Sequence, residues 1–496
     1  MVHRHMAVDI GSESGRVYIG HLKNGRIVTE EIHRFKTQFM QVHRKSLRNI
    51  YRYHEEIIKA LQLYAQKYGD TLESIGVDSW GSDFVLLDRS GNISRLPASY
   101  RTTSKTMDVV RILEQNIGVQ EIYMRTGNQA MPTDTLSQLI RLIREGDSSM
   151  DNPQGILFMG DVYHYMLGAQ PCCEHSLASY CRFYNNHTDA WDQTIMRAFH
   201  IPDSVMLPVV RAGDVIGHVD SEILKEAGIH NEVKIITPCT HDTACAALAV
   251  PDLGEDWMFI SSGTWSLMGT ETKAPIINEL SYRYNLSNSS MPLGTNMLKK
   301  NIQGMWVIQQ CLRAWNNDYS YSELVELACS VSENQVYIDV DMEEFYSPEN
   351  MAKAVATAVK RDFGVDVDWE DYGKISRICY ESLALKYRYY CDKILEVADK
   401  TISKIYILGG GSKNGLLNQL TANATGYPVY TGVTEGSSIA NILLQAYGSN
   451  EIKDKKEMRQ VVCNTYSTKM YYPKNTEVWE EKYNIFVHHI SHNAQW

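Results

Sequence analysis

Short β-rich runs alternate with longer helix-like runs along this chain, and that alternation limits the possible fold more than any other feature. The β-rich runs include MAVDIG (6–11), WMFISSG (257–263) and KIYILGGG (404–411), whereas residues 49–69 and 372–400 have the pattern of long helices. Such a mixture is typical of α/β architecture, in which helices cover sheets. Because 496 residues exceed what one hydrophobic core usually serves, we expect two or more domains.

Composition and charge exclude several classes of protein. Hydrophobic residues make up 44% and charged residues 22% of the chain, which is ordinary for a globular enzyme. No apolar run approaches the roughly 20 residues that span a bilayer. The N-terminus MVHRHMAVDIGSESGR lacks the apolar core of a signal peptide, so we expect a cytoplasmic protein without membrane contact. The ten cysteines form no C-x-x-C pair and indicate buried thiols, not a disulfide framework.

The net charge of −11 also bears on the partners of the chain. It argues against nucleic acid, whose phosphates attract clustered Lys and Arg side chains. It does not exclude a small phosphate ligand, which backbone amides can hold.

Two segments half a chain apart share one plan. HMAVDIGSESGRVYIGHL (5–22) and DWMFISSGTWSLMGTE (256–271) each contain a strand-like run, a Gly/Ser turn and a second strand-like run. Both patterns predict β-hairpins with tight polar loops. Pro and Gly punctuate the chain at residues 251–254, immediately before the second hairpin. We therefore expect one domain from residues 1–250 and another from residues 251–496.

Two glycine-rich turns are candidates for phosphate or nucleotide contacts. In AVDIGSESGR (7–16), Asp9 follows a strand, and a turn rich in backbone N–H groups can hold an anion while the carboxylate holds Mg²⁺ through water. ILGGGSKNG (407–415) permits close backbone approach, but it matches neither a dinucleotide-binding nor a Walker A motif. The structural alternatives are an ordinary hairpin and a tight strand-to-helix turn.

GVDSWGSDFVLLDRSGN (76–92) combines an aromatic ring with polar groups and glycine. Trp80 beside Asp78 and Asp83 suits a sugar, whose face stacks on a ring while its hydroxyls bond to carboxylates. The alternative is a hairpin closed by the turn at residues 88–91, with Trp80 in the core.

TPCTHDTACAALAVP (237–251) places a polar cluster before a small-residue helix and permits three interpretations. A zinc site would use Cys239, His241, Asp242 and Cys245, but no second ligand pair follows. A helix cap would use Thr240 or Asp242. A catalytic base would use Asp242, which the helix dipole keeps ionised. The second and third interpretations are compatible.

Taken in order, these segments resemble the FGGY carbohydrate kinases of the actin-like ATPase superfamily, and within that family the kinases of L-rhamnulose. The resemblance extends through FISSGTWSLMG (259–269), LKKNIQGMWVIQQ (298–310) and GVTEGSSIAN (432–441), the last with Glu435 and Asn441. It implies an α/β fold of two actin-like (ribonuclease H-like) ATPase domains that flank a central cleft. Residues 1–250 would bind sugar and supply the base, and residues 251–496 would bind nucleotide.

The resemblance also implies an activity and a set of site residues. The reaction would be ATP- and Mg²⁺-dependent phosphorylation of the 1-hydroxyl of L-rhamnulose, in rhamnose catabolism, by a monomer or homodimer that binds only sugar and ATP. Asp242 would be the catalytic base and Asp9 the magnesium ligand. Sugar contacts would come from Trp80, Gly81, Asp83 and His241. ATP contacts would come from Ser14, Gly15, Arg16, Gly263, Thr264, Asn301, Gln309, Gly410 and Gly411.

The chain departs from the family pattern at two places. Asn288–Met291 replaces an Asn-Glu-Gly-Gly element, and Ser82 replaces a small apolar residue. These departures keep two alternatives open: a kinase for another ketose or polyol, such as L-fuculose or xylulose, and a catalytically silent sensor that binds sugar or nucleotide.

Overall fold

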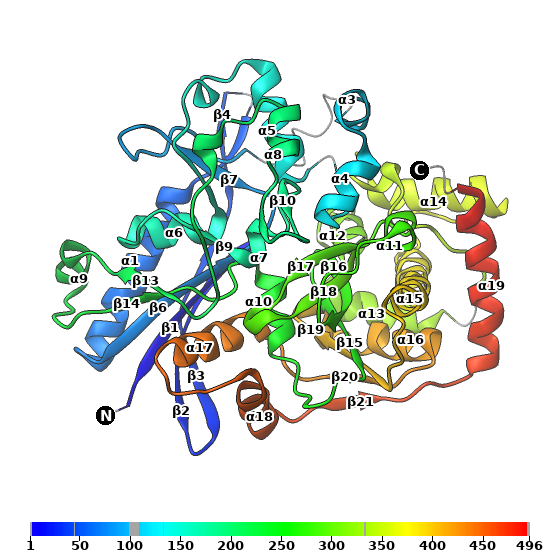
Figure 1. Cartoon of the computed structure of the whole chain (residues 1–496). Helices are drawn as coiled ribbons and strands as arrows, with labels where there is room; N and C mark the ends of the chain where they lie inside the picture. The colour runs from blue at the N-terminus through cyan, green and yellow to red at the C-terminus, as the bar shows by residue number, and fades with distance from the viewer. Residues whose placement is uncertain (1, 44, 99–108, 132, 332–333, 494–496) are drawn as a thin grey trace. The chain divides into compact units, whose positions relative to one another are not determined.

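The computed structural model describes residues 2–43, 45–98, 109–131, 133–331 and 334–493, which form two compact units (Figure 1). Unit 1 comprises Met1–Leu253, Glu271–Leu298 and Glu435–Tyr466, and unit 2 comprises Gly254–Thr270, Lys299–Thr434 and Ser467–Trp496. The chain first passes from unit 1 to unit 2 after Leu253, and it returns to unit 1 twice afterwards. The functions assigned above to residues 1–250 and 251–496 stay predictions.

Unit 1 is built on a six-stranded sheet of order β13-β14-β6-β1-β2-β3. β1 (Arg4–Ile10) is antiparallel to β2 (Ser14–Lys23) and parallel to β6 (Leu72–Ser79). Nearly every residue of β1 and β6 is buried, as expected for strands covered on both faces. This confirms the α/β expectation. The other strands are β3 (Arg26–Lys36), β13 (Val215–His218) and β14 (Lys234–Ile236).

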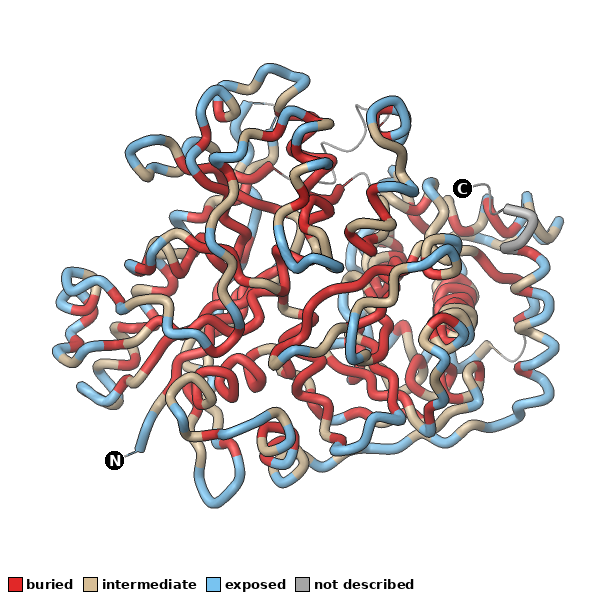
Figure 2. The backbone as a smooth tube through the Cα atoms, in the orientation of Figure 1, coloured by how far each residue is buried: buried red, intermediate tan, exposed pale blue. Residues whose placement is uncertain are grey.

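The two faces of β1 have different surroundings, because successive side chains of a strand point to opposite sides. Met6, Val8 and Ile10 join a hydrophobic cluster that includes residues of α1 (Ile50–Tyr68). Asp9 alternates with them and belongs to the other face, where α17 (Gly436–Gly448) packs on β1 and β6. In Figure 2 these strands and α17 are drawn mostly as buried.

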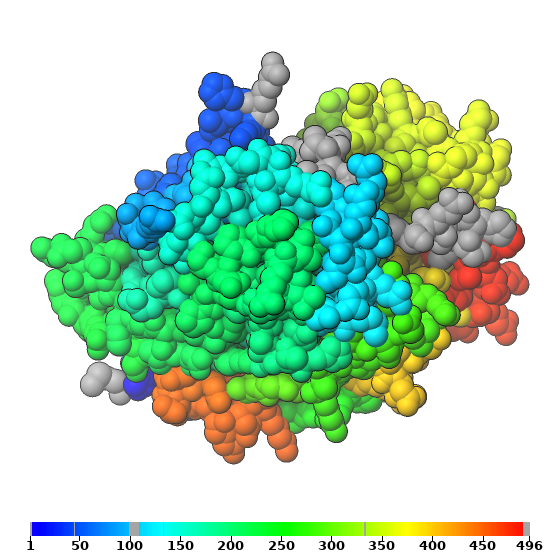
Figure 3. Space-filling view, turned by 45° about the horizontal axis from the view of Figure 1, so that its top comes forward, coloured from blue at the N-terminus to red at the C-terminus, as the bar shows by residue number. Residues whose placement is uncertain are grey.

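The contact of α17 with the sheet is made by polar side chains. Gln445 donates to Met6 O (3.0 Å) and accepts from Ser74 Oγ (2.6 Å). Asn441 donates to Gly76 O (3.1 Å), and a Cβ on Gly76 would lie 2.8 Å from its side-chain oxygen. The glycine therefore permits the close approach of the helix. Figure 3 shows the orange residues of 435–466 at the surface, below the green and cyan residues of unit 1.

A second part of unit 1 contains β7 (Phe84–Leu87), which pairs with β8 (Gly155–Phe158). The hairpin suggested for residues 76–92 is therefore wrong in its pairing, because β6 pairs with β1 and β7 pairs with β8. The turn at residues 88–91 is present and closes only an isolated bridge between Leu87 and Ile93. One face of the β7–β8 pair joins α5 (Thr135–Glu145) in a separate hydrophobic cluster, and its other face joins the cluster of β1.

In unit 2 the strands run in the order β18-β16-β15-β19-β20-β21. β15 (Trp257–Ser262) and β16 (Trp265–Thr272) form an antiparallel hairpin, so both predicted hairpins are confirmed. β15 is parallel to β19 (Lys404–Leu408), and the long helix α15 (Tyr372–Ala398) is largely buried. The other strands are β18 (Asn296–Gln303), β20 (Val429–Thr431) and β21 (Lys469–Tyr471).

The remaining elements complete the two units. In unit 1 they are β4 (Phe39–Val42), β5 (Lys45–Arg48), α3 (Val109–Asn116), α4 (Val119–Thr126), α6 (Met159–Leu167), β9 (Cys173–Glu174), α7 (His175–Ala178), β10 (Tyr184–Asn185), β11 (Ala190–Trp191), α8 (Gln193–Ala198), β12 (Val209–Val210), α9 (Ser221–Ala227), α10 (Asp242–Leu248), α11 (Glu279–Arg283), β17 (Ser287–Ser290) and α18 (Lys455–Thr465). In unit 2 they are α12 (Trp306–Ala314), α13 (Tyr321–Ser330), α14 (Met351–Phe363), α16 (Gly415–Thr425) and α19 (Thr476–Asn493).

All ten cysteines are free thiols, and only Cys329 and Cys463 are not buried. Within the described ranges, no helix combines the length and apolar character needed to cross a membrane.

Replacing Gln445 by Leu tests the polar contact of α17. We expect a loss of about 1–3 kcal/mol of stability, because Met6 O and Asn441 Oδ1 lose a buried donor while the side-chain volume changes little. The melting temperature of the variant measures the loss. The control is Gln460→Leu at an exposed position of α18, where we expect a change within about 0.5 kcal/mol. Equal changes in the two variants would contradict the importance of the contact.

Candidate functional site

The turn between β1 and β2 is tight and closely packed. Gly11 N donates to Ser14 O (3.0 Å), which closes the turn. A Cβ on Gly15 would lie 2.1 Å from the Phe35 ring, so glycine is required there by packing within unit 1, whatever else the turn binds. Ser14 begins β2 and is half-buried.

Asp9 and Arg16 face each other across the β1–β2 register and have different partners. Asp9 is only 7% exposed and accepts a hydrogen bond from Ser437 Oγ (2.7 Å). Arg16 forms an ion pair with Glu435, the residue before α17. The stretch around Glu435 and Ser437 thus supplies both a hydroxyl donor and a carboxylate to the first hairpin.

Asp78 places a second carboxylate beside Asp9, because the two residues are paired across the parallel strands β1 and β6. Asp78 is fully buried; its Oδ2 accepts from Asn441 Nδ2 (2.7 Å), and its Oδ1 has no hydrogen-bond partner in the part of the chain that the structure describes. Burial raises the pKa of Asp78 well above its usual range, and the charges of Asp9 and Asp242 raise it further. Burial also raises the pKa of Asp9, although Arg16 opposes that shift.

The segment Thr240–Asp242 is attached to the end of β6. Ser79 N donates to Thr240 O (2.9 Å), and Ser79 forms a parallel bridge with His241. Asp242 is the first residue of α10. The side chain of His241 is 4% exposed, whereas that of Asp242 is 36% exposed and lies 3.8 Å from His241 Nε2. Asp242 is therefore the accessible carboxylate of this group.

The cap interpretation of this segment needs correction. His241 occupies the N-cap position of α10 without a side-chain capping bond, and neither Thr240 nor Asp242 fills that role. The Thr240 hydroxyl bonds elsewhere, and Cys245 Sγ donates to Ser437 O (3.3 Å). Over the described ranges, no three His, Cys, Asp or Glu side chains are grouped to hold a metal ion, so the four zinc candidates form no such cluster.

Tyr180 lies between two residues that were predicted to bind sugar. Its ring stacks on that of His241, with centroids 5.2 Å apart and planes 16° apart. A Cβ on Gly81 would lie 3.3 Å from the same ring. Gly81, Tyr180 and His241 therefore meet in unit 1, although Trp80 and Asp83 are arranged differently.

Trp80 and Asp83 are buried and bonded to each other. Trp80 Nε1 donates to Asp83 Oδ2 (2.9 Å), and the guanidinium of Arg48 lies 4.4 Å from the Trp80 ring centroid. Burial raises the pKa of Asp83, against the charge of Arg48. Between them, Ser82 has a positive φ of 76°. Part of the bonding capacity of Trp80 and Asp83 is thus used within the protein.

Glu174 is a buried carboxylate that the motifs did not identify. It ends β9 and is 2% exposed. Its Oε2 accepts from Thr240 N (2.9 Å), Thr240 Oγ1 (3.2 Å) and Ser176 N (2.9 Å), and also from Ser176 Oγ. Burial raises the pKa of Glu174 to about 7, against these hydrogen bonds.

In unit 2 the second hairpin turn and the glycine turn come together. Gly263 and Thr264 form the turn between β15 and β16, and their carbonyls accept from Met305 N (3.0 Å) and Trp306 N (3.1 Å) at the start of α12. A Cβ on Gly411 would lie 2.0 Å from Ser262 Oγ. Packing therefore requires glycine at 411.

Gly409 and Gly410 differ from Gly411. Gly409 has a φ of 76°, which glycine adopts readily, and a Cβ on Gly410 would meet no atom of the described ranges within 4 Å. Asn301 is a buried residue of β18, and Gln309 is half-buried on α12, four residues after Met305. The predicted nucleotide residues of unit 2 therefore come from the ends of β15 and β19, from β18 and from α12.

The segment Asn288–Met291, where the chain departs from the family pattern, is a buried strand region of unit 1. The Asn288 side chain accepts from Ile276 N (2.8 Å) and donates to Gly127 O (3.1 Å). Ser290 N donates to Ser179 Oγ (2.9 Å).

Several residues near the predicted site were not predicted for it. Asp78 was noted in its motif but not assigned, whereas Ser437, Tyr180 and Glu174 were overlooked. The VDS pattern contained the signal for Asp78. Glu174 follows the Cys172–Cys173 pair, where no local pattern indicates a site.

Comparisons with known proteins match the chain over nearly its whole length. The model of the N-terminal domain of the FGGY family of carbohydrate kinases matches residues 5–249, and the model of its C-terminal domain matches residues 258–449. A rhamnulokinase of Bacteroides thetaiotaomicron is 36% identical over 480 residues, which cover 97% of this chain and 98% of that protein.

Two further matches extend the comparison. A rhamnulokinase of Bacillus subtilis is 33% identical over 471 residues, covering 95% of this chain and 96% of that protein. The crystal structure of a ligand-bound xylulose kinase from Lactobacillus acidophilus superposes with a TM-score of 0.82 at 14% identity, covering 100% of this chain and 99% of that chain. This similarity concerns the fold alone.

Asp78→Asn tests the cost of burying adjacent carboxylates. The pKa of Asp78 is raised in the folded state. Its contribution to stability is therefore complete below its ordinary pKa of 3.8 and is lost as the pH rises toward its folded-state pKa. Asparagine has no such loss. We therefore expect the melting temperature of the variant, relative to the unmodified protein, to rise more at pH 8 than at pH 5.

The control is Asp88→Asn. Backbone donors lower the pKa of Asp88, which is ionised at both pH values in both states. Its effect should be the same at pH 5 and pH 8. An equally flat result for Asp78→Asn would contradict the raised pKa.

Proposed function

The chain belongs to the FGGY family of carbohydrate kinases, and we propose that it transfers the γ-phosphoryl group of ATP to the 1-hydroxyl of L-rhamnulose. The products would be L-rhamnulose 1-phosphate and ADP. Two rhamnulokinases at 36% and 33% identity over nearly full length support the choice of sugar.

One observation carries the mechanism: the carboxylates near β1 and β6 differ in exposure. Asp78 is fully buried and Asp9 is 7% exposed, whereas the Asp242 side chain is 36% exposed. A general base has to reach the proton that it accepts. Asp242 meets that requirement better than its two buried neighbours.

In the proposed reaction Asp242 accepts the proton of the sugar 1-hydroxyl. The oxygen of that hydroxyl forms a bond to the γ-phosphorus, and the bond between the γ-phosphorus and the β,γ-bridging oxygen breaks, so that ADP leaves. Positioning and charge stabilisation dominate phosphoryl transfer. His241 and its stacked partner Tyr180 would orient the sugar beside Asp242.

We assign the remaining contacts by the family resemblance and the local structure. Gly81 would permit close approach of the sugar beside Tyr180, while buried Trp80 and Asp83 would shape that site from behind. The nucleotide would be held by the two hairpin turns, the glycine turn and side chains near them: Ser14, Gly15, Arg16, Gly263, Thr264, Asn301, Gln309, Gly410 and Gly411.

The carboxylates of Asp9 and Asp78 fit a magnesium ion by their charge. Burial raises the pKa of both carboxyl groups, a cost that a bound cation offsets, and Asp78 Oδ1 is buried without a hydrogen-bond partner among the described residues. Mg²⁺ takes one or two protein carboxylates and keeps waters and phosphate oxygens as its other ligands. Asp9 would hold the ion, which neutralises phosphate charge when bound.

The segment Asn288–Met291 motivates the alternatives. It lacks the carboxylate and glycines of the family element, and its Asn288 amide is already bonded within unit 1. A different acceptor, such as L-fuculose or xylulose, keeps the mechanism and changes the substrate. A sensor would bind sugar and ATP without releasing ADP.

Asp242→Asn tests the proposed base. We expect ADP release with L-rhamnulose to fall by about 10²–10⁴-fold, because a general base contributes that much. Sugar binding, measured by calorimetry, should persist. A coupled assay of ADP release against L-rhamnulose, L-fuculose and xylulose measures both the rate and the preferred acceptor.

The matched control is Glu222→Gln, an equivalent change in the exposed first turn of α9, which should leave the rate unchanged. A rate for Asp242→Asn close to that of the unmodified enzyme would refute the role of Asp242. Faster turnover with another sugar would move the assignment to that acceptor, and binding of sugar and ATP without ADP release would favour the sensor.

Gly410→Ala tests the nucleotide assignment. The added methyl group meets none of the described residues within 4 Å, so the variant should keep its melting temperature. If ATP lies there, we expect its KM to rise at least about tenfold, equivalent to about 1.4 kcal/mol, with the sugar KM unchanged.

Gly415→Ala, at the start of α16, is the control, because its Cβ would have only an ordinary contact with Tyr471 at 3.6 Å. An unchanged KM for ATP in Gly410→Ala would remove Gly410 from the nucleotide site.

A further inference from the structure

Glu174 has a local role that does not explain all of its contacts. It is the N-cap residue of α7, where its side chain accepts from Ser176 N (2.9 Å). Such a cap stabilises a helix by satisfying a backbone donor at its first turn. α7 has only four residues, and the same carboxylate oxygen extends to Thr240, which lies 66 residues later in the chain.

The contacts with Thr240 and His241 fix the backbone immediately before the proposed base. Glu174 Oε2 accepts from Thr240 N (2.9 Å) and Thr240 Oγ1 (3.2 Å). Ser176 Oγ donates to the same oxygen and accepts from His241 N (3.1 Å). Two consecutive amides that precede Asp242 are thus bound by Glu174 and Ser176.

The opposite side of the same segment is held by β6. Ser79 N donates to Thr240 O (2.9 Å), so Thr240 is bonded through its amide, its hydroxyl and its carbonyl. Since α10 begins at Asp242, the backbone of Thr240 and His241 determines where that helix starts. The position of the Asp242 carboxylate follows from it.

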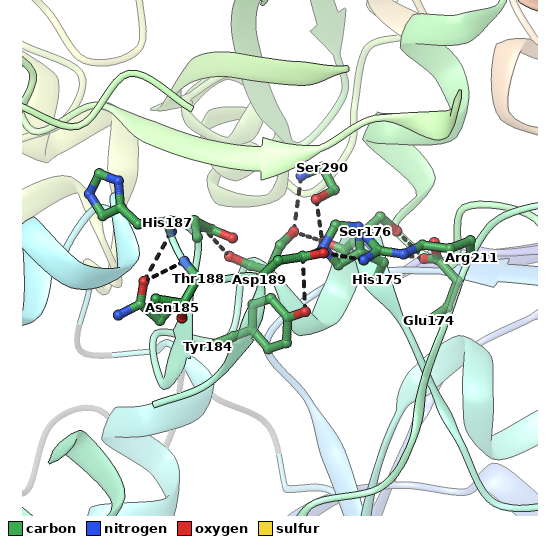
Figure 4. A network of polar contacts seen from close by, with 12 residues as sticks. Glu174, His175, Ser176, Tyr184, Asn185, His187, Thr188, Asp189, Arg211 and Ser290 are labelled. Atoms are coloured by element: carbon green, nitrogen blue, oxygen red, sulfur yellow. Dashed lines mark hydrogen bonds and ion pairs between the residues drawn. The ribbon is translucent and has the colours of Figure 1, made fainter. Parts of the chain in front are cut away.

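The free-energy cost of burying the Glu174 carboxylate indicates that these contacts are its role. A buried carboxylate without partners is strongly unfavourable, and four donors offset part of that cost here. Figure 4 shows Glu174 and Ser176 at one end of a polar network that continues through His175 and Asp189. The network also anchors β17 through a bond between Ser290 Oγ and His175 Nε2 (3.1 Å).

We propose that Glu174, acting with Ser176, is a positioning residue that fixes the Thr240–His241 backbone and thereby aims Asp242 and His241. The role rests on the proposed function, because it serves the base assigned there. Glu174 is 2% exposed and acts through its bonds to Thr240 and Ser176. If Glu174 only capped α7, its loss would affect α7 and would not alter residues 240–242.

Three variants separate positioning from capping. Glu174→Ala removes every contact, Glu174→Gln keeps an acceptor oxygen, and Asp192→Ala removes another buried N-cap carboxylate. Asp192 accepts from Thr194 N (2.9 Å) and Ile195 N (3.0 Å) at the start of α8, with no bond to residues 240–242 among its hydrogen bonds from described residues. It is therefore a matched control for lost capping.

The first measurement is hydrogen–deuterium exchange of a peptide that spans residues 237–248, which requires no activity. We expect faster exchange in Glu174→Ala than in the unmodified protein and in Asp192→Ala, and near-normal exchange in Glu174→Gln. Unchanged exchange in Glu174→Ala would overturn the proposal. So would equal exchange in Glu174→Gln and Glu174→Ala, because the amide oxygen can accept the same hydrogen bonds.

The second measurement is kcat and KM with the acceptor that the unmodified enzyme prefers. We expect kcat of Glu174→Ala to fall about 10–100-fold, since misplacement of a reacting group by about 1 Å costs up to 10²-fold, with the KM for ATP unchanged. Asp192→Ala should have a lower melting temperature than the unmodified protein but the same kcat. Equal kcat in both alanine variants would overturn the proposal.

Ser176→Ala extends the test if Glu174→Ala does not fold. It leaves Glu174 bonded to Thr240 but removes the acceptor of His241 N, so faster exchange and a severalfold lower kcat are expected. Unchanged exchange would count against the proposal. An enzyme inactive with every sugar refutes the proposed function, whereas the exchange data still report on positioning.

Discussion

Unit 1 depends on the hydrogen bonds between α17 and the strands β1 and β6. Gln445 and Asn441 lie more than 360 positions after the strand residues that they contact, yet they supply donors to Met6 O, Gly76 O and Asp78. Hydrophobic packing is not directional, but a buried amide has to match particular donors and acceptors. The polar stripe of α17 therefore fixes its register on the sheet and keeps the carboxylates at the end of the sheet in place.

The same arrangement buries carboxylates, which lowers stability, where the reaction is proposed to occur. Asp9, Asp78 and Glu174 are buried, and burial raises the pKa of each. Such groups lower stability unless donors or a cation compensate them. Donors from Ser437, Asn441, Ser176 and Thr240 supply part of that compensation. Natural proteins accept such costs at functional sites, where stability and activity make opposite demands.

The features that the sequence predicted well are local. Each hairpin depends on two adjacent runs and a short turn, and both are present. Pairing between distant segments was not predictable from local patterns: β6 pairs with β1, and β7 pairs with β8. For the same reason, local patterns could not show which glycines the packing requires. Gly15 and Gly411 face Phe35 and Ser262, so packing inside the protein requires them, whereas Gly410 has open space beside it. Glu174 was overlooked because its partner Thr240 is 66 residues away.

The segment Asn288–Met291 is connected by packing and hydrogen bonds to the residues proposed to bind the sugar. Its strand β17 packs against α7, and Ser290 bonds both to Ser179 at the end of α7 and to His175, the residue after Glu174. α7 leads to Tyr180, which stacks on His241, and Glu174 bonds to Thr240. A shift of β17 therefore reaches both the ring beside Gly81 and the backbone before Asp242. Because the same contacts connect β17 to the residues proposed to orient the acceptor and to the proposed base, we expect changes in this segment to alter the acceptor preference and the rate together.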